Sequence, residues 1–264
     1  MKIVSWNINA LRAHENYFRK AMEELQPDIF CLQEIKVRED QQTFPVSGYH
    51  SIMNSAAMSQ YYGTGVFIRN DIRPLSVTFD KPLDNYDYQG RIIAIELEKC
   101  FLINSYWPFS AYRKDGYWLT YRIKWNNQFQ SFIHELQVKK PVVICGDMNM
   151  VRDTADTFDG RAVKRAGCFY PEEHDAFERM LREERLIDSF RLLHPIHDGI
   201  TIGSGDYSAW AYSKGDEQRK ANQGFRIDYF LISETLLPAL NSSEILSDIH
   251  GSDHCPILID IDVH

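Results

Sequence analysis

The stretch PVVICGDMN, residues 141–149, passes from an apolar run to two polar side chains separated by one residue. The run PVVI is short and rich in branched residues, which predicts a buried strand. Gly146 then leads into Asp147 and Asn149. Because Asp and Asn after a strand often only cap a turn, this stretch alone leaves their purpose open.

Comparable apolar runs along the chain predict further strands at residues 2–6, 28–33, 49–54, 65–69, 91–97, 100–107, 227–233, 243–248 and 256–262. Helical spacing of apolar residues predicts helices at residues 16–25, 117–138 and 172–184. Many strands with helices between them predict an α/β fold, in which two packed sheets are covered by helices. We see no linker at which to divide the chain, so we expect one domain over residues 1–264.

Composition, cysteine usage and net charge indicate an ordinary globular protein. Of the 264 residues, 44% are hydrophobic and 25% are charged, as in an ordinary globular protein with a sizeable core. Three of the five cysteines, Cys31, Cys100 and Cys145, lie in or beside apolar runs, and we interpret them as buried free thiols in a reducing compartment. No signal peptide and no membrane-spanning run is visible, so we expect a cytoplasmic protein without membrane contact. The net charge of −8 argues against binding nucleic acid through bulk charge, but allows a local basic face.

Polar side chains stand at the ends of many of the predicted strands. They are carboxylates, amides, a tyrosine and a histidine, namely Asn7, Asn9, Glu34, Tyr106, Asp147, Asn149, Asp228, Asp253 and His254. Each one alone is more often a turn cap or a solvated group. If the strand ends share one edge, however, these residues form one polar cluster on a rigid support.

The residue types in this cluster suit phosphate chemistry with a hard cation. Mg²⁺ takes one or two carboxylates and leaves room for phosphate oxygens. An Asp can activate water as a general base, and a protonated His can neutralise charge on a phosphoryl oxygen. The chain has neither a P-loop nor a G-x-S-x-G motif. The sequence therefore indicates metal-assisted hydrolysis of a phosphate ester.

At these positions the chain resembles the exonuclease III family of abasic-site endonucleases, within the endonuclease/exonuclease/phosphatase superfamily. The matching segments run in family order over nearly the whole chain, and the most specific are LQE (32–34), GDMN (146–149), RIDYFLIS (226–233) and SDHCP (252–256). The resemblance implies a four-layer α/β sandwich with two central mixed sheets flanked by helices. It also implies cleavage of double-stranded DNA 5′ to abasic sites, trimming of 3′ ends, and Mg²⁺, or Mn²⁺, as cofactor.

Roles for individual residues follow from the same resemblance. Glu34 would bind the metal, with further metal contacts from Asn7, Asp147, Asn149 and Asp253. Tyr106 would contact the scissile phosphate, and Asp147 would align or deprotonate the attacking water with the help of Asn149. Asp228 and Asp253 would complete the hydrogen-bonded ring, with Asp253 orienting His254. His254 would stabilise the pentacovalent phosphorane.

For DNA contacts, we expect residues of the loops around the strand ends, namely Asn9, Arg12, Arg113, Lys114, Trp210, Phe225 and Arg226. The substrates would be abasic or 3′-blocked duplexes, bound by a monomer. Four positions, Ala10, Phe109, Ala209 and Phe225, depart from the pattern of many relatives. Ala209 and Phe225 fall where the resemblance places the pocket for an extruded abasic sugar, so a changed lining would shift the balance between incision and 3′ trimming.

Two other functions remain open at this point. One is a phosphatase or phosphodiesterase of the same superfamily that acts on small-molecule or lipid phosphates. The other is a nucleic-acid-binding regulator that has lost catalysis, although the presence of Glu34, Asp147 and His254 argues against it.

Overall fold

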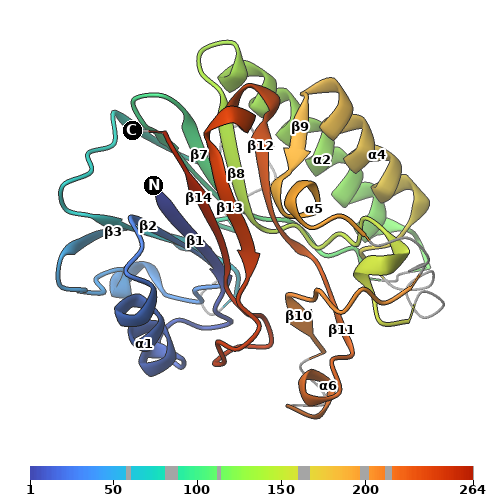
Figure 1. Ribbon diagram of the computed structural model, residues 1–264, viewed down its shortest axis with the longest axis horizontal. Helices are drawn as coiled ribbons and strands as arrows, with labels where there is room; N and C mark the ends of the chain where they lie inside the picture. Colours follow the sequence, from blue (N-terminus) through green and yellow to red (C-terminus); the bar gives the residue numbers. More distant parts are fainter. Residues whose placement is uncertain are drawn as a thin grey trace.

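A computed structural model shows two six-stranded mixed sheets packed face to face (Figure 1). It describes residues 1–57, 61–80, 89–111, 114–159, 167–196, 202–211 and 216–263. The first sheet has the order β13-β14-β1-β2-β4-β3, with β1 (Lys2–Asn7), β2 (Ile29–Gln33), β3 (Tyr49–Asn54), β4 (Thr64–Arg69), β13 (Leu240–Ile245) and β14 (Ile257–Ile261). The second has the order β5-β6-β7-β8-β12-β9, with β5 (Ser76–Phe79), β6 (Ile92–Glu96), β7 (Phe101–Tyr106), β8 (Val142–Asp147), β9 (Leu186–Asp188) and β12 (Asp228–Ser233).

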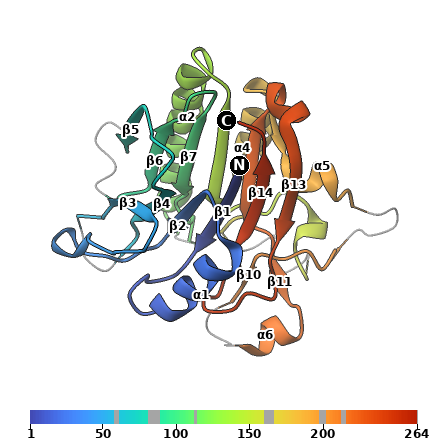
Figure 2. The same cartoon turned by 60° about the vertical axis from the view of Figure 1, so that its left-hand side comes forward.

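Helices cover the outer faces of both sheets, which confirms the four-layer sandwich. Helix α1 (Glu15–Leu25) lies on one side, and α2 (Tyr117–Gln137) and α4 (Pro171–Glu183) lie on the other (Figures 1 and 2). Shorter helices are α5 (Ser189–Leu193) and α6 (Asp216–Lys220), and short 3₁₀ turns include η1 (Glu39–Gln41), η2 (Thr154–Asp156) and η4 (Glu234–Ala239). No helix within the described ranges is both long enough and apolar enough to cross a membrane.

The alternation of side chains along each strand explains these layers. In β8, Val142 and Ile144 pack in the cluster that contains Trp125, Phe129 and Phe132 of α2. Val143 and Cys145 point the other way, into the cluster that joins the two sheets. Because both faces of β8 are covered, an unbroken apolar run is required, as the sequence showed. All five cysteines are buried and free, which confirms that part of the sequence interpretation.

The structure adds strands that the sequence patterns did not predict. They are β5, β9, β10 (Ala209–Trp210) and β11 (Gly224–Phe225), and the last two pair as a separate small sheet. Most of these are too short to show a period of two. The predicted strand at residues 243–248 is displaced, because β13 covers Leu240–Ile245. This strand lies at a sheet edge and is mostly polar, so its apolar pattern is weak.

Candidate active site

The predicted polar residues meet where strand ends of both sheets converge. In the first sheet, Asn7 ends β1 and Glu34 follows β2. In the second sheet, Tyr106 and Asp147 are register partners at the ends of the parallel strands β7 and β8. Asp228, at the start of the antiparallel strand β12, is paired with Asp147 from the other side. Opposite strand directions thus bring residues far apart in sequence to one edge.

Gly146 is needed for this convergence. Its backbone has φ of +134°, and a Cβ there would lie 1.8 Å from the carbonyl oxygen of Ser105 on β7. No L side chain fits such a close approach of two backbones. The glycine in GDMN therefore lets β8 run tightly against β7 and deliver Asp147 beside Tyr106.

Asn7 connects the two sheets at the site. Its Nδ2 donates to Glu34 Oε1 and to Asp147 Oδ2, both at 2.9 Å. The Asn7 side chain is fully buried, so its bond to Asp147 is shielded from water, whereas its bond to Glu34 is only partly buried. One amide thereby holds two carboxylates from different sheets close together.

Lys36 extends this polar chain, and the sequence analysis gave it no role. Its Nζ lies 2.9 Å from Glu34 Oε2 and 2.5 Å from Asn9 Oδ1. Asn9 Nδ2 in turn donates to Asp253 Oδ1 at 3.0 Å. Burial raises the pKa of Glu34, but Lys36 and the Asn7 amide lower it by more, so the pKa lies below its usual value and the carboxylate stays charged. The only sequence signal was a lysine two residues after a strand-end glutamate.

His254 is oriented by Asp228, which corrects the expectation that Asp253 does so. His254 Nδ1 lies 2.8 Å from Asp228 Oδ2, and Ser208 Oγ donates to the same oxygen at 2.6 Å. Asp253 accepts instead from Asn9 and Ser252. Burial lowers the pKa of His254, but the Asp228 carboxylate outweighs it and raises this pKa well above the usual value. The imidazolium is therefore favoured.

Asp147 faces His254 in a water-poor environment. Its Oδ2 lies 3.9 Å from His254 Nε2, and its Oδ1 accepts the backbone N–H of Asn149 at 2.9 Å. Burial raises the pKa of Asp147 to about 7, although the charge of His254 acts in the opposite direction. A carboxyl group with this pKa can take up and release a proton near neutral pH.

Tyr106 and Asn149 complete the group. Burial, Glu34 and Asp147 raise the pKa of Tyr106 well above its usual value, so its hydroxyl remains a hydrogen-bond donor. Asn149 Nδ2 donates to the Trp107 carbonyl at 2.9 Å, which leaves its second amide hydrogen for another acceptor. The Asn149 Oδ1 lies 3.7 Å from the thiol of Cys168.

A family model for the endonuclease/exonuclease/phosphatase family matches residues 4–254. The chain belongs to this family. It is 37% identical over 265 residues to an exodeoxyribonuclease of Bacillus subtilis, with both chains covered completely. It is 32% identical over 272 residues to a DNA-(apurinic or apyrimidinic site) endonuclease of Dictyostelium discoideum, covering 100% of this chain and 71% of that one. Among solved structures, a 3′ phosphatase from Neisseria bound to product DNA hairpin matches with a TM-score of 0.85 and 26% identity, over 99% of both chains.

The donor set of this family member fits a hard divalent cation. Glu34 and Asp147 supply carboxylate oxygens that the Asn7 amide holds together. Lys36 Nζ lies 2.9 Å from the other oxygen of Glu34, so this carboxylate is also paired with an ammonium. Asp147, Asp228 and His254 also offer atoms within 4.8 Å of one another.

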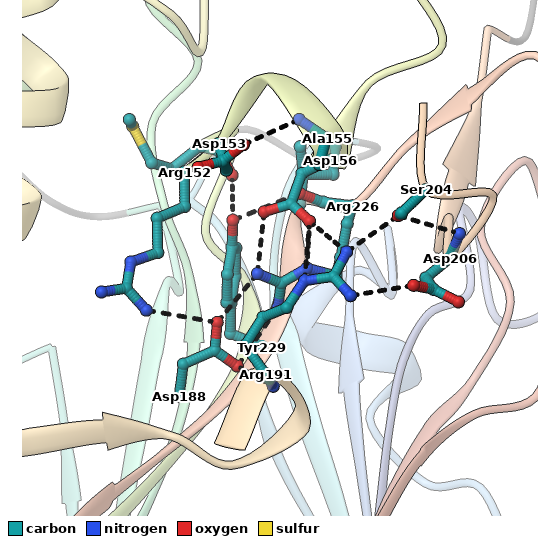
Figure 3. Close-up of polar contacts among 12 residues, drawn as sticks. Arg152, Asp153, Ala155, Asp156, Asp188, Arg191, Ser204, Asp206, Arg226 and Tyr229 are labelled. Atoms are coloured by element: carbon teal, nitrogen blue, oxygen red, sulfur yellow. Dashed lines mark hydrogen bonds and ion pairs between the residues drawn. The ribbon is translucent and has the colours of Figure 1, made fainter. Parts of the chain in front are cut away.

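Arg226 does not lie on a DNA-binding face, and that prediction is corrected. Figure 3 shows its guanidinium enclosed between Asp156 and Asp188. Arg226 Nη2 lies 2.8 Å from an oxygen of each of these carboxylates. Arg191 Nη2 reaches the other oxygen of Asp156 at 2.6 Å. Only 1% of Arg226 is exposed. Its charge can be buried because the carboxylates of Asp156 and Asp188 neutralise it. The buried ion pairs tie η2 and β9 to the segment that enters β12 just before Asp228.

The other residues predicted to contact DNA differ in accessibility. Arg12 and Lys114 are exposed, and Arg12 Nη2 donates to the carbonyls of Gln41 and Thr43 at 2.7 and 3.1 Å. Phe225 is half-buried against Phe158. Trp210 is 5% exposed and lies under the guanidinium of Arg219, so its indole has little surface to offer. Arg113 lies outside the described residues.

The departures from the family pattern also have defined positions. Ala10 adopts φ of +85°, so an alanine itself takes the left-handed conformation that favours glycine. Phe109 is 47% exposed beside the strand end that carries Tyr106. Ala209 is buried, and its backbone pairs with Phe225 on one side and with His254 on the other.

Proposed function

We propose that the protein is a metal-dependent phosphodiester hydrolase that cuts the DNA backbone 5′ to abasic sites and trims 3′ ends. One observation carries this function. Glu34 and Asp147, from different sheets, are held together by Asn7 beside the Asp228–His254 pair. Such a site can bind a cation, a water and one phosphate in the same place. The names of the relatives in Bacillus subtilis and Dictyostelium discoideum support DNA as the substrate.

Each residue then has a part in hydrolysis. Asp147 would take the proton of the attacking water, and Asn149 would donate its second amide hydrogen to the phosphate and so help to hold it in line with the water. The Tyr106 hydroxyl would donate to a phosphate oxygen. The imidazolium of His254, held by Asp228, would neutralise the charge that grows on the phosphorane.

A divalent cation, Mg²⁺ or Mn²⁺, would be held by Glu34 with Asn7 and Asp147, and would supply Lewis-acid stabilisation of the phosphate oxygens. Asn149 and Asp253 remain proposed contributors to that site. The Asp253 carboxylate is linked to Glu34 through Asn9 and Lys36, so it supports the same group of residues. We further propose that the chain acts as a single-domain monomer in the cytoplasm.

A substrate panel tests this function. Purified protein is incubated with Mg²⁺, or with EDTA, and with a duplex that contains one central abasic site. An intact duplex, a duplex with a recessed 3′ end, and soluble phosphate esters serve as comparisons. We expect incision at the abasic site and trimming of the recessed end only with Mg²⁺, and neither under multiple-turnover conditions with Asp147→Asn. Preferred hydrolysis of the esters would indicate the small-molecule phosphatase, and DNA retention without cleavage would indicate the regulator. Either result contradicts the proposed function.

A further inference from the structure

Tyr62 lies next to Tyr106, and Tyr61 lies next to Tyr62, but neither has a part in the hydrolysis proposed above. The ring centroid of Tyr62 lies 6.1 Å from that of Tyr106, and the ring centroid of Tyr61 lies 6.2 Å from that of Tyr62. Exposure increases along this series, from 7% for Tyr106 to 58% for Tyr61. The three rings therefore form a continuous aromatic path from the buried site to solvent.

The backbone holds the middle ring of this path in place. Tyr62 has φ of +56°, a left-handed conformation that is uncommon for a bulky residue. Its carbonyl accepts the N–H of Lys36 at 3.0 Å, and the carbonyl of Gly63 accepts the N–H of Ile35 at 3.1 Å. These bonds fasten Tyr62 to the turn that carries Glu34 and Lys36. Such local strain persists where the surroundings enforce it, often at functional sites.

The buried guanidinium of Arg91 contacts the rings of both Tyr62 and Tyr106. The Arg91 Cζ lies 4.5 Å from the ring centroid of Tyr62 and 4.9 Å from that of Tyr106. Arg91 Nη1 also donates to the carbonyl of Tyr106 at 3.0 Å. The guanidinium thus fixes the position of both rings relative to β7. It also places positive charge beside the path, which favours a polyanionic ligand over an apolar one.

We propose that Tyr61 and Tyr62 form a stacking platform for an unpaired base of DNA whose backbone occupies the site. Every base offers a flat π-face, and an exposed tyrosine ring can stack on it without selecting a sequence. A base inside an intact duplex already stacks on its neighbours and cannot reach Tyr61. The platform would therefore favour single-stranded or frayed nucleotides next to the phosphate at Tyr106. This assignment rests on the proposed function, because it requires DNA in the site.

Binding measurements without metal test the platform separately from catalysis. A short single-stranded oligonucleotide with one 2-aminopurine and a blunt, fully paired duplex are each titrated with protein in EDTA. The variants are Tyr61→Ala, which removes the ring, and Tyr61→Phe, which keeps it as a matched control. Loss of one stacked base should weaken binding of the single strand by Tyr61→Ala about tenfold, with less quenching of the 2-aminopurine. Tyr61→Phe should bind like the wild type, and neither variant should change binding of the duplex.

Two results would overturn the platform. One is unchanged binding and quenching of the single strand by Tyr61→Ala. The other is an equal loss of affinity for single strand and duplex, which would indicate a contact that ignores base pairing. Incision by the wild-type protein with Mg²⁺ is measured in parallel. If the wild-type protein incises DNA but Tyr61→Ala leaves single-strand binding unchanged, the platform alone is contradicted. If Tyr61→Ala weakens single-strand binding but the wild-type protein cuts no DNA, the platform is supported and the proposed hydrolase is contradicted.

Discussion

Replacing Arg226 by methionine separates a structural role for this residue from a DNA contact. Methionine keeps an unbranched apolar stem and removes the guanidinium from between Asp156 and Asp188. Removing one partner of a buried ion pair typically costs about 3–5 kcal/mol of the free energy of unfolding. Asp156 keeps Arg191 at 2.6 Å and Asp188 keeps Arg152 at 3.7 Å, which favours the lower end, about 3 kcal/mol. For a chain of this size the melting temperature should fall by about 6 °C.

Two measurements decide between the roles. Thermal unfolding followed by circular dichroism gives the loss of stability, and fluorescence anisotropy in EDTA gives the salt dependence of binding to an abasic duplex. We expect Arg226→Met to lose stability without a change in the salt slope, because Arg226 touches no phosphate. The exposed Arg12 is the matched control. Arg12→Met loses hydrogen bonds to the carbonyls of Gln41 and Thr43 rather than a buried ion pair, so it should lose less stability than Arg226→Met. An Arg226→Met variant of normal stability whose salt slope is smaller by about 0.9 would refute the buried role.

Three further predictions concern the site and its support. Asp228→Asn should lower the single-turnover rate of incision by about 10³–10⁴, because the imidazole loses the carboxylate that orients it. The melting temperature should also fall, since Asp228 is one partner of a buried charged pair. Burial raises the pKa of Asp156, but Arg226 and Arg191 lower it below the usual 3.8. Its contribution to stability is therefore complete above pH 3.8 and disappears as the pH falls through the folded-state pKa, so urea midpoints should fall on acidification by less in Asp156→Asn than in the wild type. Ala10→Gly should raise the free energy of unfolding by up to about 1 kcal/mol, since it relieves a positive φ; a lower urea midpoint would contradict this.

The strand ends could be found from the sequence because the central strands are buried on both faces. Such strands need unbroken apolar runs, and a polar residue at the end of a run is then conspicuous. Glu34 and Asp147 were found in this way, and the structure joins both to Asn7. The edge strand β13 is mostly polar, so its apolar pattern is weak, and the sequence predicts it at residues 243–248 rather than at Leu240–Ile245.

The partner of His254 could not be read from the order of residues. Asp253 is its neighbour in sequence, but its carboxylate is held by Asn9 and Ser252 instead. Asp228 lies 26 residues away from His254, and the antiparallel pairing of β12 with β8 places it beside Asp147, which His254 also faces. Sequence adjacency was therefore a poor guide to contact in this case.

The location of Arg226 could not be predicted for a similar reason. An arginine beside a strand end resembles a phosphate contact when only the sequence is known. Its burial depends on Asp156 and Asp188, which are 70 and 38 residues away. Lys36 was missed because a lysine in a loop is usually solvated, and only the turn after β2 brings it onto Glu34.

The most direct test is a double-mutant cycle in single-turnover incision of an abasic duplex, with Glu34→Gln from the first sheet and Asp147→Asn from the second. Residues that act together in one catalytic site show strongly non-additive losses. The double variant should therefore be at most about tenfold slower than the slower of the two single variants. Losses that simply multiply, or full activity of either single variant, would contradict a common hydrolytic site.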